Sequence, residues 1–264
     1  MKCKRNTIPS IWTNEIKAES NNIVLGVFSE KGGSCKSTVS YQLLNVLAKS
    51  GLKVKGIDTD PQGTLYNQWT RLGRGYELFQ KMKYFDHSNA FEVVQHDINL
   101  DLLKVLEISN RDGYDVIVID TPSHLSDNHS RLFSQCDLAI FTFNDTDDDI
   151  ATSDRVKMFV ESAKRQYGNV AQSYSLLTEQ PNTPADRERE LQEDWKRKGY
   201  ETTHPLLDAR IINRQIYRDV KRAGLAVGDI SGKYGTLANN EQIAYIIEIF
   251  DRTFQLDQDE ALAS

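Results

Sequence analysis

The apolar residues of this chain gather in five short runs separated by longer amphipathic stretches. The runs are Ile23–Phe28, Val54–Ile57, Val116–Ile119, Leu138–Phe143 and Ser173–Leu177. The run Val116–Ile119 is β-branched throughout and too apolar for a strand with one face in water, which is typical of a buried parallel strand.

The stretches between these runs carry apolar residues at helical spacing and predict helices. The predicted helices are Thr38–Lys49, Ala90–Ser109, Ile150–Tyr167, Pro184–Lys198, Ile211–Ala223 and Asn240–Leu256. Strands that alternate with helices predict an α/β fold, a doubly wound and mostly parallel sheet with helices on both faces. The chain has 264 residues, enough for one such domain, which we place at residues 23–264.

The first 22 residues precede this pattern and are mostly polar. Their few large apolar side chains are spaced to allow one or two helical turns. We expect residues 1–22 to form a flexible or docking arm and favour disorder, because so little apolar surface cannot offset the entropy of ordering. The apolar residues concerned are Ile8, Ile11, Trp12 and Ile16.

Composition says more about the cellular compartment of the protein than about its function. The chain has 32 Lys and Arg against 38 Asp and Glu, a formal net charge of −6, so it is not a basic protein as a whole. No stretch approaches the ~20 apolar residues of a membrane span, and the polar start does not resemble a signal peptide, so we expect a cytoplasmic protein. Cys3, Cys35 and Cys136 lie singly, which predicts neither a disulfide nor a structural metal site.

A glycine-rich loop follows the first apolar run. Residues 30–38 read Glu-Lys-Gly-Gly-Ser-Cys-Lys-Ser-Thr, between a predicted strand and a predicted helix. Backbone N–H groups in such a P-loop point at a phosphate, Lys36 would reach the β- and γ-phosphates, and the Ser37 hydroxyl would hold Mg²⁺. The predicted nucleotide-binding residues are Lys31, Gly32, Gly33, Ser34, Cys35, Lys36, Ser37 and Thr38.

Two further motifs place carboxylates at the ends of predicted strands. The second run continues into Asp-Thr-Asp-Pro-Gln-Gly, where Asp58 and Asp60 share one side of an extended segment and could both face the phosphates. The third run ends at Asp120, followed by Thr-Pro-Ser, as a Walker B strand does before a switch segment. An acidic turn and a chance terminal aspartate are the simpler alternatives, and three motifs in one order make coincidence a weak explanation.

Together these motifs resemble the ParA/MinD family of dimerising ATPases, whose deviant Walker A motif has a second lysine before its glycine pair, here Lys31. The resemblance covers roughly residues 23–250 and is weak after Asn144. It implies ATP and Mg²⁺ as cofactors and slow hydrolysis that a partner stimulates. It also implies that Lys31 crosses a dimer interface to the phosphates of the partner's nucleotide.

The resemblance assigns roles to the carboxylates as well. Asp60 would position the attacking water, which makes it catalytic together with Lys31 and Lys36, while Asp58 and Asp120 would support Mg²⁺ through water. One position departs from the pattern, because Cys35 replaces the glycine that family members have immediately before the lysine equivalent to Lys36. We expect right-handed helical backbone there, which cysteine fits; a positive φ would weaken nucleotide binding.

The C-terminal region contains a basic segment that indicates a possible cargo. Residues 210–222 hold five basic residues and one acid, Asp219, and at helical spacing the cations would form a ridge opposite an apolar stripe. A solvated basic face is equally compatible with the pattern. The resemblance implies non-specific DNA binding, for which the predicted residues are Arg210, Arg214, Arg218, Lys221 and Arg222. We expect the acidic run Asp145–Asp149 to be a solvated helix N-terminus.

The predicted function is an ATP-dependent dimerising ATPase that binds DNA non-specifically in plasmid or chromosome partition and associates with the nucleoid when ATP-bound. The homodimer would be joined by a small activating protein, ParB-like or a relaxosome component. An accessory ATPase of conjugative DNA transfer is the close alternative. A metabolic P-loop ligase is less favoured, as is a MinD-like membrane ATPase, because residues 248–264 lack a basic amphipathic face, and no stable membrane binding is expected.

Overall fold

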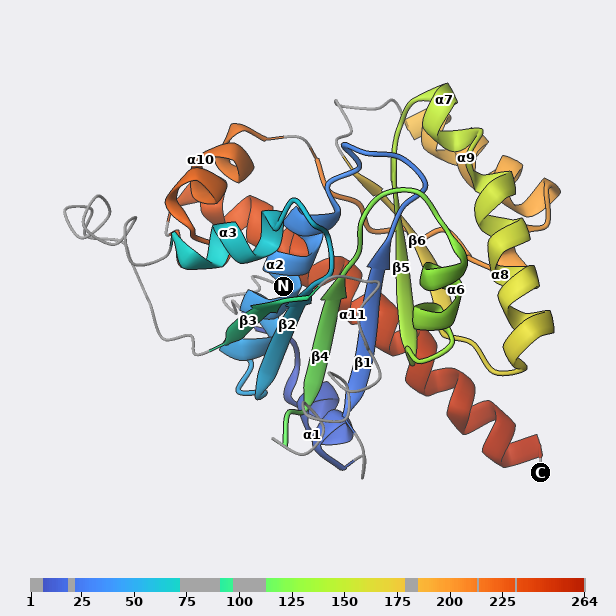
Figure 1. Cartoon of the computed structure of the whole chain (residues 1–264), viewed down its shortest axis with the longest axis horizontal. Helices are drawn as coiled ribbons and strands as arrows, with labels where there is room; N and C mark the ends of the chain where they lie inside the picture. Colours follow the sequence, from blue (N-terminus) through green and yellow to red (C-terminus); the bar gives the residue numbers. More distant parts are fainter. Residues whose placement is uncertain are drawn as a thin grey trace.

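The computed structural model describes residues 7–18, 22–71, 91–96, 113–178, 185–212, 214–230 and 232–263. Six strands within these residues form one parallel sheet in the order β3-β2-β4-β1-β5-β6, with helices on both faces (Figure 1), which confirms the predicted fold class. The strands are β1 (Ile23–Phe28), β2 (Val54–Asp58), β3 (Glu92–Gln95), β4 (Val116–Asp120), β5 (Leu138–Asn144) and β6 (Gln172–Thr178).

Helices and short 3₁₀ turns connect the strands. They are α1 (Ser10–Ala18), α2 (Lys36–Lys49), α3 (Thr64–Thr70), α6 (Asp127–Phe133), α7 (Asp147–Ile150), α8 (Ser153–Tyr167), α9 (Ala185–Arg197), η1 (Tyr200–Thr202), α10 (Gln215–Ala223), η2 (Val227–Asp229) and α11 (Lys233–Ala263). None of the helices in the described ranges combines the length and apolarity that a membrane crossing would need.

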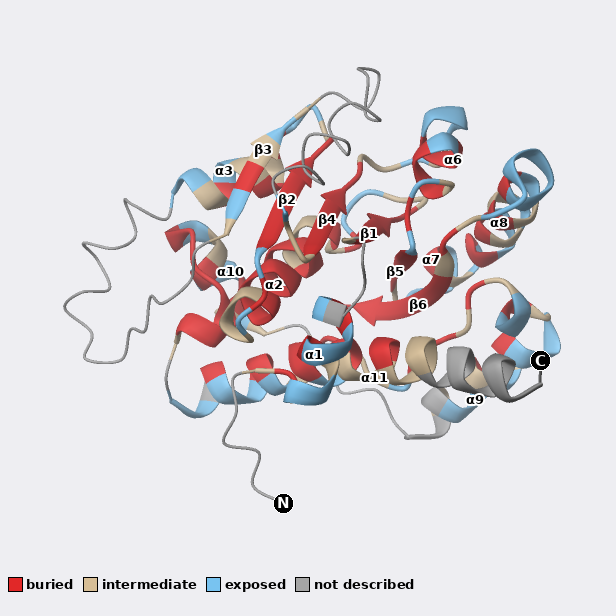
Figure 2. Ribbon diagram, turned by 90° about the horizontal axis from the view of Figure 1, so that it is seen from below, coloured by how far each residue is buried: buried red, intermediate tan, exposed pale blue. Residues whose placement is uncertain are grey.

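Alternation along the strands explains why both faces of the sheet are covered. In β1, Leu25 and Val27 belong to the apolar layer that also contains residues of α2, α10 and α11, whereas Val24 and Phe28 belong to the layer with residues of α6, α8 and α9. Figure 2 shows α2 and α11 on one side of the buried strands and α6 and α8 on the other. The sheet therefore forms a middle layer between two apolar cores.

The order of the strands fixes where a ligand can bind. β1 lies between β4 and β5, while the chain that leaves β1 continues to β2 on the far side of β4. This change of direction opens a crevice at the carboxyl ends of the strands, the usual ligand position in such sheets. The register places Asp120 beside both Val27 and Asp58 at that edge.

Of the two arrangements expected for the arm, the structure shows docking for residues 7–18 and not the favoured disorder. Ile8 and Ile16 are only 3% and 2% exposed within the apolar layer of α2 and α11. Trp12 stacks on Phe254 of α11 with ring centroids 5.6 Å apart, and the Ile8 N–H donates to the Ser50 Oγ at 3.1 Å. The few apolar residues of the arm are thus sufficient when the domain offers them a surface.

Two predicted helices also need correction. Residues 92–95, placed in the predicted helix Ala90–Ser109, form the edge strand β3, with Val93 buried against β2; the rest of that helix, from residue 97, lies outside the described residues. The helix predicted for Ile211–Ala223 begins only at Gln215. By contrast, β1 has the predicted bounds, and the other four predicted strands are each extended by one or two residues.

Candidate functional site

The P-loop connects β1 to α2 and is braced from behind by hydroxyl groups. The Ser34 Oγ donates to the Lys31 carbonyl at 3.3 Å and accepts a hydrogen bond from the Thr142 Oγ1 at 3.0 Å. The Thr178 Oγ1 donates to the Ser34 carbonyl at 3.1 Å. Thr142 and Thr178 come from β5 and β6, so neighbouring strands hold the loop, and Gly33 supplies the left-handed conformation that it needs, with φ of 84°.

Lys36 is buried at the centre of this loop, with 7% exposure. Its ammonium donates to the Ser29 Oγ at 2.8 Å and to the Ser123 Oγ at 2.9 Å. Burial lowers the pKa of Lys36, and the negative charges of Asp120 and Asp60 oppose that shift. A buried ammonium held by hydroxyl groups can exchange them for phosphate oxygens, as the predicted role of Lys36 requires.

Cys35 does not have the predicted conformation. It precedes α2 with φ of 63° and ψ of 18°, in the left-handed region, so the expectation of right-handed backbone is wrong. Left-handed backbone brings Cβ of an L-residue too close to the following carbonyl oxygen, which costs roughly 1–2 kcal/mol. The position therefore has the geometry for which glycine is suited, and cysteine occupies it under strain.

Two buried carboxylates lie side by side at the ends of β2 and β4. Asp120 is fully buried; its Oδ1 accepts a hydrogen bond from the Ser40 Oγ at 2.9 Å, whereas its Oδ2 has no hydrogen-bond partner in the described part of the chain. Burial, followed by the charge of Asp58, raises the pKa of Asp120 to about 7, while the Ser37 and Ser40 hydroxyls and Lys36 act against this rise.

This arrangement fits a magnesium ion that arrives with a nucleotide. Mg²⁺ keeps several waters and is usually held by one or two carboxylates together with substrate phosphates. The unsatisfied Asp120 Oδ2 and the neighbouring Ser37 hydroxyl supply suitable oxygens. Asp58 differs, because its oxygens accept the N–H groups of Asp60 at 3.0 Å and Tyr66 at 2.9 Å. Asp58 thereby holds the segment that carries Asp60, and its role at Mg²⁺ stays a prediction.

A pocket of about 380 Å³ brings most of these groups together. Residues 33–38 of the P-loop line it, together with Asp60 and Ser123. The Asp60 Oδ1 accepts the Gln62 N–H at 2.9 Å, so the loop after β2 holds this carboxylate in place at the pocket. The structure thus places predicted catalytic residues Lys36 and Asp60 around one cavity.

Lys31 lies at the outer edge of the P-loop, with 40% of its side chain exposed. Its ammonium is 3.2 Å from the Asp149 Oδ1, while the Asp149 Oδ2 accepts the Asn144 N–H at 3.3 Å. Asp149 is 7% exposed, so this end of the acidic run is not the solvated terminus that we expected. Instead it connects α7 to the second lysine of the loop.

The predicted basic ridge does not form as one helical face. Arg210 and Arg214 precede the first turn of α10, and the Arg214 Nε donates to the Glu241 Oε1 of α11 at 3.0 Å. Arg218 and Lys221 line the pocket in front of the P-loop, and Arg222 is exposed outside that lining. The prediction of five aligned cations is therefore wrong, because the helix starts too late to include the first two.

Several residues of the site escaped the sequence analysis. Ser29 and the threonines at the ends of β5 and β6 stabilise the loop, and a hydroxyl at the carboxyl end of each predicted strand was a usable signal. Asp149 and the pocket residues Ile211, Ile212 and Tyr217 carried no such signal, since only the fold brings them close to the P-loop.

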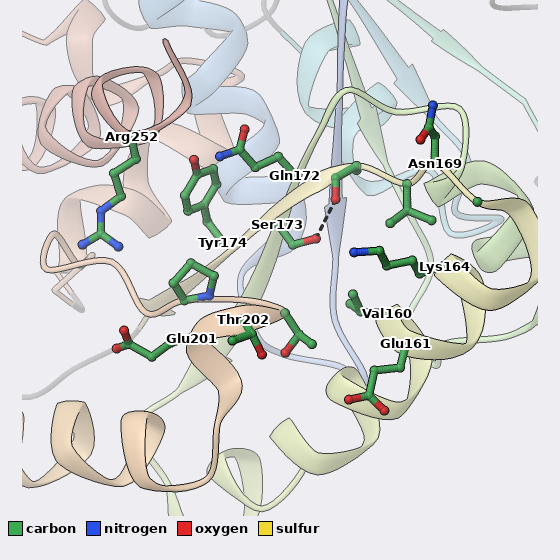
Figure 3. Close-up of a pocket in the computed structure, with 15 residues that line it drawn as sticks. Val160, Glu161, Lys164, Asn169, Gln172, Ser173, Tyr174, Glu201, Thr202 and Arg252 are labelled. Atoms are coloured by element: carbon green, nitrogen blue, oxygen red, sulfur yellow. Dashed lines mark hydrogen bonds between the residues drawn. The ribbon is translucent and has the colours of Figure 1, made fainter. Parts of the chain in front are cut away.

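A second cavity, of about 890 Å³, lies at the amino end of β6 between α8, η1 and α11 (Figure 3). Lys164, Arg252, Glu161 and Glu201 give its walls charges of both signs. None of the predicted site residues lines it, and it is formed at the end of β6 opposite to the one that braces the P-loop. The size of a cavity therefore does not identify the site in this protein; the P-loop and its carboxylates do.

Comparison with known proteins agrees with this geometry. The family model described as the CobQ/CobB/MinD/ParA nucleotide binding domain matches residues 25–260. No curated protein matches the chain.

Solved structures of low sequence identity have the same fold. A Cyanothece McdA variant in complex with ATP is 14% identical, with a TM-score of 0.64 over 90% of this chain and 98% of that one. A Borrelia burgdorferi structure described as a plasmid partition protein bound to AMPPNP is 18% identical, with a TM-score of 0.63 over 86% and 99%. The septum site-determining protein MinD of Pyrococcus horikoshii, complexed with Mg-ADP, is 19% identical, with a TM-score of 0.59 over 86% and 96%.

Proposed function

The chain belongs to the CobQ/CobB/MinD/ParA nucleotide-binding domain family, and from that premise we propose that it is an ATP-dependent dimerising switch that binds DNA non-specifically in plasmid or chromosome partition. ATP joins two copies of the chain in this proposal, and hydrolysis separates them. A small partner protein stimulates the otherwise slow hydrolysis.

The observation that carries this proposal is the contrast between the two lysines of the P-loop. Lys36 is 7% exposed and points to buried hydroxyl groups, as a residue that binds its own nucleotide should. The Lys31 side chain is 40% exposed at the rim, as a residue that reaches a second subunit should be. One loop thus offers one inward and one outward cation, which supports phosphate binding within a subunit and across a dimer.

The residues around the pocket support the chemistry of ATP hydrolysis. ATP supplies the reactive γ-phosphoryl group, and Mg²⁺ neutralises its charge. Lys36 and the backbone of the P-loop would bind the phosphates, and Ser37 and Asp120 would hold the ion. Asp60, held by the N–H of Gln62, would orient the attacking water. Solved relatives bound to ATP, AMPPNP and Mg-ADP support these ligands for this chain too.

Two observations bear on DNA as the cargo. The similarity to a structure described as a plasmid partition protein favours it. The exposed Arg222 side chain can contact the phosphates of DNA, whereas the Arg214 guanidinium donates to Glu241.

Binding to a non-specific DNA duplex tests the proposal, measured at fixed salt with no nucleotide, with ADP, or with ATP and Mg²⁺, while light scattering follows the mass. We expect dimers and DNA binding only with ATP and Mg²⁺. Lys36→Ala should lose both, and Asp60→Ala should bind ATP and accumulate dimers. Dimers that do not bind DNA would refute the proposal that DNA is the cargo. A protein that stays monomeric in all three conditions would refute ATP-dependent dimerisation.

A further inference from the structure

The pocket in front of the P-loop has a second wall that the sequence motifs do not explain. Residues 33–38 form the first wall, and the opposite one comes from α10 and the segment before it, including Ile212, Tyr217, Arg218 and Lys221. Figure 1 shows α10 beside α3 at the edge of the sheet where β1 leads into the P-loop. A helix that is distant from the P-loop in sequence therefore faces the same cavity.

Packing fixes which side of α10 turns to the pocket. Tyr217 and Val220 are buried, and the Tyr217 hydroxyl accepts a hydrogen bond from the Gln242 Nε2 of α11 at 2.7 Å. The Gln68 Nε2 of α3 donates to the Leu225 carbonyl just after α10 at 3.1 Å. With the helix anchored on both α3 and α11, the side that carries Arg218 and Lys221 is held toward the cavity.

The charges of this wall lack the partners that basic residues usually find. Within the described residues, neither Arg218 nor Lys221 forms an ion pair, in contrast to Arg214 with Glu241. Lys36 is a third cation in the pocket lining, and Asp60 is the one carboxylate among the described residues that line it. A concave site with an excess of cations favours a ligand with several negative charges, such as a polyphosphate.

We propose that Arg218 and Lys221 bind the phosphates of the nucleotide from the side opposite the P-loop. Helix α10 is then part of the nucleotide site rather than of a DNA-binding ridge. The inference rests on the proposed ATP binding and adds residues to that same site. Because the contact is electrostatic, its contribution rises with the number of phosphates on the ligand.

Calorimetric titration of the full chain with Mg²⁺ and ATP, ADP or AMP tests the inference. We expect Arg218→Gln and Lys221→Gln each to weaken ATP binding about tenfold, as the loss of one charge-assisted hydrogen bond does. The loss should be smaller for ADP and smallest for AMP. Lys221→Arg keeps the charge and should retain most of the affinity.

Arg222→Gln is the matched control, because it removes a cation from the same helix outside the pocket lining and should leave nucleotide affinity unchanged. Circular dichroism of each variant confirms that it is folded. Wild-type ATP affinity in both pocket variants would overturn the inference. If those variants had also lost DNA binding, Arg218 and Lys221 would instead belong to the DNA-binding surface. Absence of ATP binding by the wild type would instead overturn the proposed function, and a loss confined to Lys36→Ala would overturn only the contribution of α10.

Discussion

At the scale of single residues, Cys35 has a backbone conformation that suits glycine better than cysteine. Its φ of 63° would cost glycine nothing, but it brings a Cβ atom against the backbone at the very start of α2. The N–H groups at the start of such a helix are the ones that would face a bound phosphate. Strain at Cys35 is therefore expected to lower both the free energy of unfolding and the affinity of the P-loop for nucleotide.

Replacing Cys35 by glycine should relieve this strain. We expect Cys35→Gly to raise the free energy of unfolding by about 1 kcal/mol and to tighten nucleotide binding, as measured by denaturant titration and calorimetry. Cys35→Ala is the control, because it removes the thiol but keeps Cβ, so it should show neither gain. Equal gains in the two variants would assign the effect to the thiol instead of to φ.

At the scale of elements, the first helix shows how tertiary contacts can order a segment that looks disordered in sequence. Helix α1 has one buried and one exposed face, since Ile16 is 2% exposed and Ile11 is 57% exposed. Burial against the layer of α2 and α11 supplies the free energy that the isolated segment lacks.

A pair of substitutions in α1 tests whether the arm is an integral part of the domain. Ile16→Ala should lower the free energy of unfolding by roughly 2–4 kcal/mol, the usual loss for a large buried aliphatic side chain. Ile11→Ala removes the same atoms from an exposed position and should change it by less than about 0.5 kcal/mol. Urea denaturation of both proteins provides the comparison. Similar small losses in the two variants would mean that residues 7–18 do not stabilise the domain in solution.

The buried strands could be predicted from the sequence because short apolar runs alternate with longer amphipathic stretches, the pattern of a parallel sheet covered on both faces. The beginning of α10 could not, because the sheet competes with the helix for the same residues. The Ile211 N–H donates to the Leu177 carbonyl at 3.0 Å, and Leu206 bridges to Ser175, so the chain before α10 pairs with β6. Local periodicity contains no information about that competition.

The residues of the candidate site likewise fall into those that the sequence could predict and those that it could not. Lys36, Ser37 and Asp120 were predictable because strand ends and a glycine-rich loop place them at one edge of any sheet of this kind. The partners of Lys31 and Arg214 were not, since Asp149 and Glu241 lie more than 100 and about 30 residues away in sequence and meet them only through the fold.

At the scale of the whole molecule, the ion pair between Lys31 and Asp149 is the contact that Lys31 makes in a single subunit. The Lys31 side chain is 40% exposed, whereas that of Asp149 is 10% exposed, so water screens the lysine end of the pair only. A second subunit that presents a triphosphate would offer Lys31 a much larger negative charge. Because the Lys31 end of the pair is accessible, Lys31 can exchange Asp149 for that triphosphate when two nucleotide-bound subunits meet.

Substitution of Lys31 separates this exchange from nucleotide binding. Lys31→Ala should retain monomer affinity for ATP within about threefold, because Lys36 binds the phosphates within the subunit, but should form no dimer with ATP and Mg²⁺ in light scattering. Asp149→Asn removes only the partner within the subunit and should still dimerise. Dimers of Lys31→Ala at wild-type concentrations would show that Lys31 does not join the subunits, and lost ATP binding in its monomer would show that Lys31 acts on its own nucleotide.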